Sequence, residues 1–179
     1  PLAVEATGIF LQCSQTNFDE KTLALVRQGI NPIWFDGVTL SVGADESKAI
    51  NFDNRPKVIL SASGMCEAGR IRHHLKHNLW RGDCIVLFVG YQAEGSLGRK
   101  LQNGAKSVRL FGEEIAVNAE IATLHGTSGH ADRDGLLRWL AGFAEKPKLV
   151  FVNHGDETSC EAFRDTLKKL GYRAEAPYS

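Results

Sequence analysis

Two histidines in the last third of the chain stand in polar motifs that could support chemistry. His130 lies in the run Thr-Ser-Gly-His-Ala-Asp over residues 127–132, and His154 lies in Asn-His-Gly-Asp over residues 153–156. The second motif follows an apolar run over residues 149–152 that is typical of a buried strand. A histidine at the tip of such a strand is well placed to bind a metal ion or to carry a proton.

Each motif also has a purely structural interpretation. His130 would sit in a polar turn, with Asp132 and Asp134 as a pair that caps the following helix. His154 would bond to Asp156 or to the backbone at the end of its strand. Each motif taken alone favours this interpretation. Their order of strand, motif, helix, strand and motif favours chemistry, because a βαβ unit brings both strand ends to one edge of a sheet.

The metal ligands that these histidines should serve are incomplete. The chain has six histidines and no HxH, HExxH or CxxC pair, whereas a catalytic zinc site takes three ligands from the protein. We therefore expect a fragment of a metalloenzyme, with the rest of the site upstream. The first residue, Pro1, is not a methionine, which agrees with this expectation.

Two glycine-rich turns form a second group of candidates, since each follows an expected strand and opens an expected helix. Backbone N–H groups at such a turn can bind an anion. The first turn, over 64–70, nearly matches the P-loop spacing, but Arg70 and Ile71 stand where lysine and a hydroxyl residue belong. Nucleotide triphosphate binding is therefore disfavoured, and another kind of phosphate binding stays open. The alternative is that these glycines only make tight turns.

One segment is densely basic, with residues Arg70, Arg72, His73, His74, Lys76, His77 and Arg81. His73 and His77 are four apart, so one helix face would carry both, but no third metal ligand is in view. A solvated basic face is the favoured interpretation and a metal site the least favoured. A patch that binds the phosphates of a nucleic acid ranks between the two.

Composition limits the classes of partner and compartment. The chain has 21 basic residues (Lys and Arg) and 21 acidic residues (Asp and Glu), so its net charge is zero. The protein as a whole therefore does not attract nucleic acid, and any such contact requires a local basic patch. Four scattered cysteines suit a reduced, cytoplasmic compartment. No run approaches transmembrane length and no signal peptide is visible, so we expect no membrane partner.

The pattern of apolar residues predicts an α/β fold, a mainly parallel sheet with helices on both faces. A strand or loop is expected over 31–44 and a short helix over 47–50. The remaining expected helices span 3–13, 19–28, 67–79, 96–102, 133–143 and 160–170, and the expected strands span 57–60, 84–89, 108–111, 115–124 and 149–152. Asp19 is expected to cap the helix over 19–28, and Gly29 to end it.

Four motifs in this order closely resemble the β-CASP branch of the metallo-β-lactamase superfamily. They are SASGMCEAGR over 61–70, GYQAEGSLGR over 90–99, SGHAD over 128–132 and NHGD over 153–156. The branch contains RNA-processing nucleases such as ribonuclease J and the endonuclease that cleaves pre-mRNA 3′ ends. The resemblance covers essentially the whole chain. It implies a β-CASP domain over residues 1–124 and the C-terminal segment of a metallo-β-lactamase domain over 125–179.

The resemblance also implies roles for the two histidines. His130 would be catalytic, binding and protonating at the scissile phosphate, and His154 would be a ligand to one of two zinc ions. The HxHxDH signature that supplies other ligands would lie upstream of Pro1. We therefore expect a fragment of a zinc-dependent ribonuclease that is itself inactive. Two zinc ions can generate hydroxide near neutral pH, and an imidazole can protonate the leaving oxygen.

Single-stranded RNA is the expected substrate, and the missing N-terminal metallo-β-lactamase part of the same protein is the expected partner; a homodimer is left open. The residues expected to hold RNA phosphates are Ser61, Ser63, Gly64, Arg70, Gly95, Ser96, Arg99, Ser128 and Gly129. One rival is a non-catalytic nucleic-acid-binding module from an inactive paralogue, against which the intact histidines argue. The other is a nucleotide-binding domain that uses the 64–70 turn, which an ATP titration would distinguish.

Overall fold

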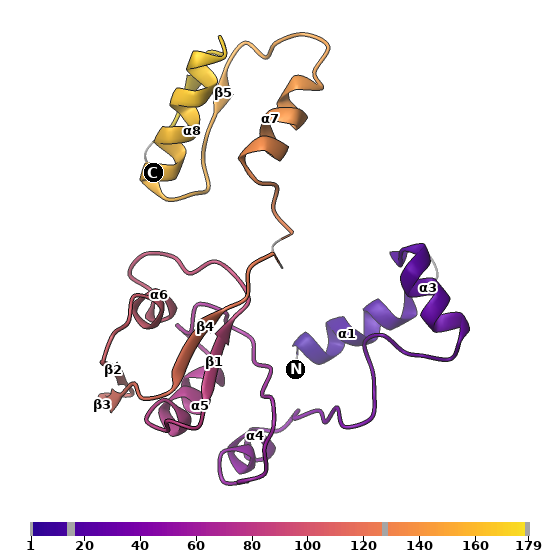
Figure 1. The fold of residues 1–179 in the computed structure, drawn as a ribbon, viewed down its shortest axis with the longest axis vertical. Helices are drawn as coiled ribbons and strands as arrows, with labels where there is room; N and C mark the ends of the chain where they lie inside the picture. The colour runs from indigo at the N-terminus through magenta and orange to yellow at the C-terminus, as the bar shows by residue number, and fades with distance from the viewer. Residues whose placement is uncertain (1, 14–16, 127–128, 178–179) are drawn as a thin grey trace. The chain divides into compact units, whose positions relative to one another are not determined.

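A computed structural model describes residues 2–13, 17–126 and 129–177, and the expected contact residue Ser128 lies outside these ranges. The chain divides into two compact units, and Figure 1 shows their helices and strands coloured from the N-terminus to the C-terminus. The first comprises Pro1–Ser63 and Ala68–Asn78, and the second comprises Gly64–Glu67 and Leu79–Ser179. Among the described residues, none of the helices is both long and apolar enough to cross a membrane.

The first unit contains helices and no strand in its described part. Its helices are α1 (Leu2–Gln12), α3 (Glu20–Arg27), α4 (Ala44–Ile50) and α5 (Ile71–Asn78). Asp19 caps α3 by accepting a hydrogen bond from the Thr22 N–H at 2.8 Å, and Gly29 follows the helix with φ of 78°. These are the expected start and stop signals of that helix, and they are confirmed.

Two other expectations for this unit need correction. Residues 57–60 form no strand, and the side chains of Val58 and Leu60 are 87% and 93% exposed. An apolar run becomes a strand only when a neighbouring strand supplies hydrogen bonds, and none pairs with it here. Helix α5 begins four residues later than expected, because Gly69 adopts φ of 73°, a left-handed conformation that an α-helix cannot include.

The second unit holds three two-stranded sheets in its described part. Strand β1 (Ile85–Phe88) pairs in parallel with β4 (Glu120–Thr123), with Ile85 opposite Glu120. Strands β2 (Ser107–Leu110) and β3 (Glu113–Ala116) form an antiparallel hairpin. Its two turn residues, Phe111 and Gly112, both have positive φ, as the tightest hairpin turns require. Strand β5 (Val150–Phe151) pairs in parallel with β6 (Ala174–Glu175).

The α/β class is therefore confirmed, with parallel pairing in two of the three sheets. A single mainly parallel sheet does not form among the described residues, because each strand has one neighbour only. The expected strand over 115–124 is divided into β3 and β4. The break lies at Asn118 and Ala119, whose N–H groups both donate to the carbonyl of Leu79, at 2.8 and 2.9 Å, rather than to a strand.

Three helices complete the second unit: α6 (Leu97–Gln102), α7 (Arg133–Ala141) and α8 (Glu157–Lys169). Leu79, Leu101, Leu110 and Leu167 are fully buried. Leu140 of α7, Leu167 of α8 and Ala174 of β6 form a core cluster, against which Val150 of β5 packs. Helices α7 and α8 and strands β5 and β6 thus share one apolar core, which burial of these side chains stabilises. The expected βαβ unit that would bring the strand ends before His130 and His154 to one sheet edge does not form among the described residues, because β4 pairs with β1 and β5 pairs with β6.

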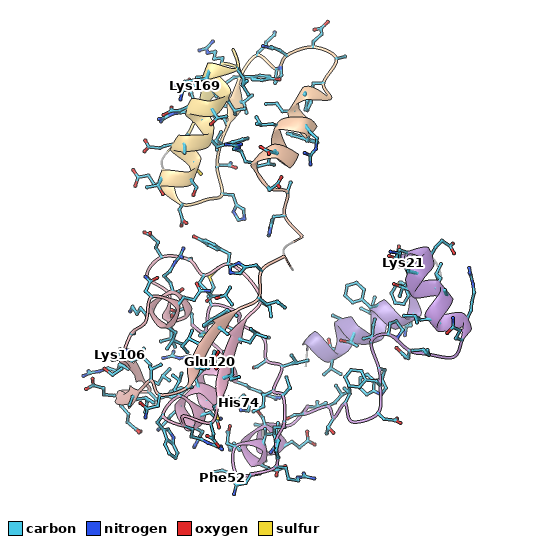
Figure 2. All side chains as sticks on the ribbon, in the orientation of Figure 1. Lys21, Phe52, His74, Lys106, Glu120 and Lys169 are labelled. Carbon is cyan, nitrogen blue, oxygen red and sulfur yellow. The ribbon has the colours of Figure 1, made fainter. Side chains whose placement is uncertain are left out.

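His74 joins α4 to α5 inside the first unit (Figure 2). Its side chain is 6% exposed, its Nδ1 lies 2.8 Å from Asn51 Oδ1, and its Nε2 lies 3.2 Å from Ser47 Oγ. Burial lowers the pKa of His74, and the nearby charges of His73, His77 and Arg70 lower it further. The neutral imidazole is therefore the form that the fold stabilises.

Because of His74, the folded chain should become less stable as the pH decreases. A histidine whose pKa is lower in the folded state contributes stability above its unfolded pKa, about 6.5, and loses it as the pH falls below that value. We expect thermal unfolding to occur at a lower temperature at pH 5.5 than at pH 7.5. The variant His74→Ala should lose about 1–3 kcal/mol at pH 7.5, since two hydrogen bonds disappear.

The control is His125→Gln, because His125 is exposed. That variant should keep the pH dependence of the wild type, whereas His74→Ala should flatten it. An unchanged pH profile in His74→Ala would contradict the assignment to this residue.

Candidate functional site

Part of the first glycine-rich turn, residues 64–67, lies in the second unit together with the second turn. The N–H of Gly98 donates to the Met65 carbonyl at 3.1 Å, and the N–H of Leu97 donates to the carboxylate of Glu67. Two segments thirty residues apart in sequence are thus held by hydrogen bonds at the start of α6. The structure therefore brings Gly64, from the first turn, into the same unit as Gly95, Ser96 and Arg99 from the second.

The N–H groups at the start of α6 are already occupied. Ser96 caps the helix by accepting from the Arg99 N–H at 3.1 Å, and its hydroxyl donates to the Ala93 carbonyl at 2.7 Å. With Leu97 and Gly98 bonded to the first turn, the protein itself fills the positions that a phosphate would take. These backbone N–H groups are thus already hydrogen-bonded within the protein, and phosphate binding by the side chain of Arg99 stays a prediction.

Gln92 shapes this turn from inside. Its side chain is 2% exposed, and its Nε2 donates to the carbonyls of Gly90 and Tyr91 at 3.2 and 3.1 Å. Its Oε1 has no hydrogen-bond partner among the described residues. A Cβ placed on Gly98 would lie 1.7 Å from that oxygen, so only glycine fits at position 98 in this conformation. Sequence reasoning did not single out Gln92, although the motif over 90–99 contains it.

Arg99 connects this turn to the C-terminal histidine motif. Its Nη2 lies 3.9 Å from Oδ2 of Asp156, and its guanidinium lies over the Tyr91 ring, 5.4 Å from the ring centroid. The Tyr91 hydroxyl donates to Oδ1 of Asp156, and this hydrogen bond raises the pKa of Tyr91. A cavity of about 370 Å³, largely open to solvent, lies beside the arginine and is lined by Glu94, Gly95, Arg99 and Asn103.

Arg70 has a different environment, in the first unit. Its Nη1 and Nη2 donate to the carbonyls of Ser41 and Val42, at 2.8 and 2.6 Å. The guanidinium thus braces a loop 28 residues away through backbone oxygens. Ser61 and Ser63 belong to the same unit, and the Ser63 hydroxyl accepts from the Ala68 N–H at 3.2 Å. These residues stay predictions as phosphate contacts, and the contacts of Arg70 favour the structural alternative.

The two histidines of the C-terminal motifs, His130 and His154, are exposed, as is Gly129. His154 has φ of 62°, a left-handed backbone that residues other than glycine seldom adopt. Asp132 caps α7 by accepting from the Gly135 N–H at 2.7 Å, as predicted. Asp134 is not a cap, because its carboxylate pairs with Arg133 at 3.0 Å.

The described residues do not fit a complete metal site. In residues 2–13, 17–126 and 129–177, no group of three His, Cys, Asp or Glu side chains could hold a metal ion. The spacing of His73 and His77 builds no site either, and His77 instead packs edge-on against Phe52, with ring centroids 5.7 Å apart. His154 can therefore be at most one ligand of a set that these residues do not complete.

Comparison with known proteins establishes the family. Residues 1–101 match the family described as the Beta-Casp domain, and residues 114–177 match the family described as the Zn-dependent metallo-hydrolase RNA specificity domain. The chain therefore belongs to the β-CASP branch of the metallo-β-lactamase superfamily, as its four motifs predicted.

Two relatives show how far the similarity extends. The chain is 43% identical to ribonuclease TTHA0252 of Thermus thermophilus over 86% of this chain and 35% of that protein. It is 32% identical to transcription termination factor FttA of Methanocaldococcus jannaschii over 93% of this chain and 27% of that protein. The chain thus spans about a third or less of the length of the relatives that it matches.

Proposed function

We propose that the protein to which this chain belongs is a zinc-dependent ribonuclease that hydrolyses phosphodiester bonds of single-stranded RNA, in RNA processing or decay. The observation that carries the proposal is the match of residues 114–177, which contain both histidine motifs, to an RNA specificity domain of Zn-dependent metallo-hydrolases. The ribonuclease name of a relative that is 43% identical supports the same activity.

In this proposal the two exposed histidines have different roles. His130, which is exposed, donates a proton to the oxygen that leaves when the phosphodiester breaks, the general-acid role that an imidazole can fill. His154 is a zinc ligand. Its left-handed backbone supports that role, because strained conformations of this kind are retained chiefly at functional sites.

Arg99 is the phosphate contact that the geometry favours most, because it borders a cavity and pairs only loosely with Asp156. Its fork of donors suits a phosphate. The other expected RNA contacts stay predictions: Ser61, Ser63, Gly64, Arg70, Gly95, Ser96, Ser128 and Gly129.

The organisation proposed for the protein follows the family. Residues 1–124 form the β-CASP domain, and residues 125–179 form the C-terminal segment of the metallo-β-lactamase domain. The remaining zinc ligands come from an N-terminal metallo-β-lactamase part of the same protein. Since the described residues do not complete a zinc site, we propose that this chain by itself is inactive. A cytoplasmic location and a homodimer remain predictions.

The isolated chain should hold little zinc and cleave no RNA. A catalytic zinc site takes three protein ligands, so we expect well under one zinc per chain after dialysis. The measurement is metal analysis of the purified chain, together with incubation of labelled single-stranded RNA with the chain and added zinc. The full-length protein, treated identically, is the control and should retain zinc and cleave. Stoichiometric, chelator-resistant zinc in the isolated chain would overturn the proposed ligand arrangement.

A second candidate is a non-catalytic RNA-binding module. Relatives that are 30–36% identical to this chain are named transcription termination factors, a name that states no cleavage of RNA. The same comparison separates the two candidates. A full-length protein that binds single-stranded RNA and holds zinc, yet leaves the strand intact, would support the module and contradict the ribonuclease.

A further inference from the structure

Asp156 occupies the N-cap position of α8, but its carboxylate accepts no capping hydrogen bond from that helix. Its backbone has the extended conformation of an N-cap residue, with φ of −61° and ψ of 146°, but its side chain accepts no hydrogen bond from the first turn of α8. Asp19 and Asp132 hold the same position in α3 and α7, and both accept from the N–H three residues on. The carboxylate of Asp156 therefore has another use.

That use is contact with the second glycine-rich turn. Oδ1 of Asp156 accepts the hydrogen bond from the Tyr91 hydroxyl, and Oδ2 lies 3.9 Å from Nη2 of Arg99. The Tyr91 ring also lies under the Arg99 guanidinium, at 5.4 Å. Two side chains, 57 residues or more from Asp156 along the chain, thus meet at one carboxylate. The arginine is held by a charge on one side and by an aromatic face on another.

The contacts with Asp156 and Tyr91 leave Arg99 able to bind a ligand. The side chains of Arg99 and Asp156 are 30% and 29% exposed, so their attraction is screened by water and contributes little. The Nε of Arg99 is buried and has no hydrogen-bond partner among the described residues. Arg99 also lines the cavity of about 370 Å³ beside Glu94 and Asn103. The contacts with Asp156 and Tyr91 therefore orient the guanidinium, while its Nε makes no hydrogen bond to the described residues.

We propose that Asp156 and Tyr91 are positioning residues that orient Arg99 toward this cavity to bind one phosphate of the RNA strand. The inference rests on the proposed function, and it names what holds the phosphate contact in place. Orienting a long side chain before binding lowers the entropy lost when RNA binds. It also gives Asp156 a role different from that of His154, two residues before it, since Asp156 acts through Arg99.

The first test measures the affinity of the whole chain for labelled single-stranded RNA over a range of salt concentrations. Tyr91→Phe keeps the ring under Arg99 and removes the hydroxyl, so it should weaken binding roughly 2- to 10-fold. Its salt slope should stay that of the wild type, because no phosphate contact is lost. Arg99→Ala should flatten the log–log slope by about 0.7, the value for one single-strand phosphate.

A double-mutant cycle decides whether Tyr91 acts through Arg99. In the Arg99→Ala background, Tyr91→Phe should have no further effect on RNA affinity. An equal loss of affinity in both backgrounds, or no loss in either, would overturn the proposal. Asp165→Asn is the matched control, because Asp165 is a carboxylate of α8 that forms an ion pair with its neighbour Arg164; it should leave affinity unchanged.

Asp156 is tested by comparing two uncharged replacements, so that loss of a negative charge near RNA cancels. Asp156→Asn keeps an oxygen that can accept from Tyr91, and Asp156→Ala does not. The asparagine variant should bind RNA more tightly than the alanine variant, and equal affinities would overturn the role of Asp156. RNA binding by the wild type without any effect of Arg99→Ala would sink this inference alone, whereas no RNA binding by the wild type would sink the proposed function with it.

Discussion

Replacing His130 by alanine in the full-length protein is expected to slow RNA cleavage about 10²–10⁴-fold, the usual contribution of a general acid. The bound zinc should stay in place, because His130 is proposed to protonate the leaving oxygen and to bind no metal. The measurement is the single-turnover rate of cleavage of a labelled RNA, together with metal analysis of the same preparation. A leaving group that needs no proton should be cleaved with a smaller loss of rate.

The contrasting variant is His154→Ala, which should lose zinc as well as activity, since a zinc ligand disappears. The two histidines are thereby distinguished by metal content rather than by rate alone. Equal loss of zinc in both variants would show that the roles assigned to His130 and His154 are wrong, even if both variants were inactive.

The second large effect concerns the stability of the turn over residues 90–99. Gly98→Ala would place a Cβ 1.7 Å from Gln92 Oε1 and 3.2 Å from a ring carbon of Phe88. Neither neighbour can move freely, because Gln92 is 2% exposed and Phe88 is 4% exposed. Overpacking of this kind costs about 1–3 kcal/mol. We expect that loss in the free energy of unfolding measured with denaturant.

The control for this variant is Gly90→Ala in the same turn, where a Cβ would meet nothing within 4 Å. That change should alter stability little. Adding Gln92→Ala to Gly98→Ala should recover part of the loss, since the first clash disappears, and the two substitutions should therefore be non-additive. Additive losses would mean that Gly98 is required for a reason other than the contact with Gln92.

Local signals in the sequence predicted the helices well. Asp19 and Asp132 cap the helices that they were expected to cap, because a cap needs only a backbone N–H three residues away. Most elements of the second unit were also located to within a few residues. The two-residue strand β6 was missed, since a strand that short carries no readable pattern of apolar residues.

Pairing between distant segments could not be predicted in the same way. The apolar run over 57–60 has the composition of a buried strand, yet nothing in its sequence states whether another strand lies beside it. Arg70 was expected to contact phosphate or to lie on a solvated basic face, and it bonds to carbonyls 28 and 29 residues away instead. Backbone acceptors are present at every residue, so composition does not identify which of them a side chain will meet.

In the candidate site, too, local motifs were recognisable in the sequence, whereas the contacts between distant segments were not. The motifs over 90–99 and 153–156 were singled out in the sequence, and the structure brings side chains of both segments into contact. The contact between Tyr91 and Asp156 spans 65 residues and was not visible in either motif. The partner once considered for Asp156 was His154, its near neighbour, and the carboxylate is instead bonded to Tyr91.

The left-handed backbone of His154 has a consequence for the evolution of this protein. A residue with a Cβ gives up about 1–2 kcal/mol in that conformation, which glycine adopts without strain. With the proposed role of His154 as a zinc ligand, natural variation at position 154 is subject to two opposed pressures, toward glycine for a more stable fold and toward histidine for its imidazole. In a lineage that no longer needs the imidazole, replacement by glycine would stabilise the fold. Histidine at this position therefore indicates that its side chain is still selected for function.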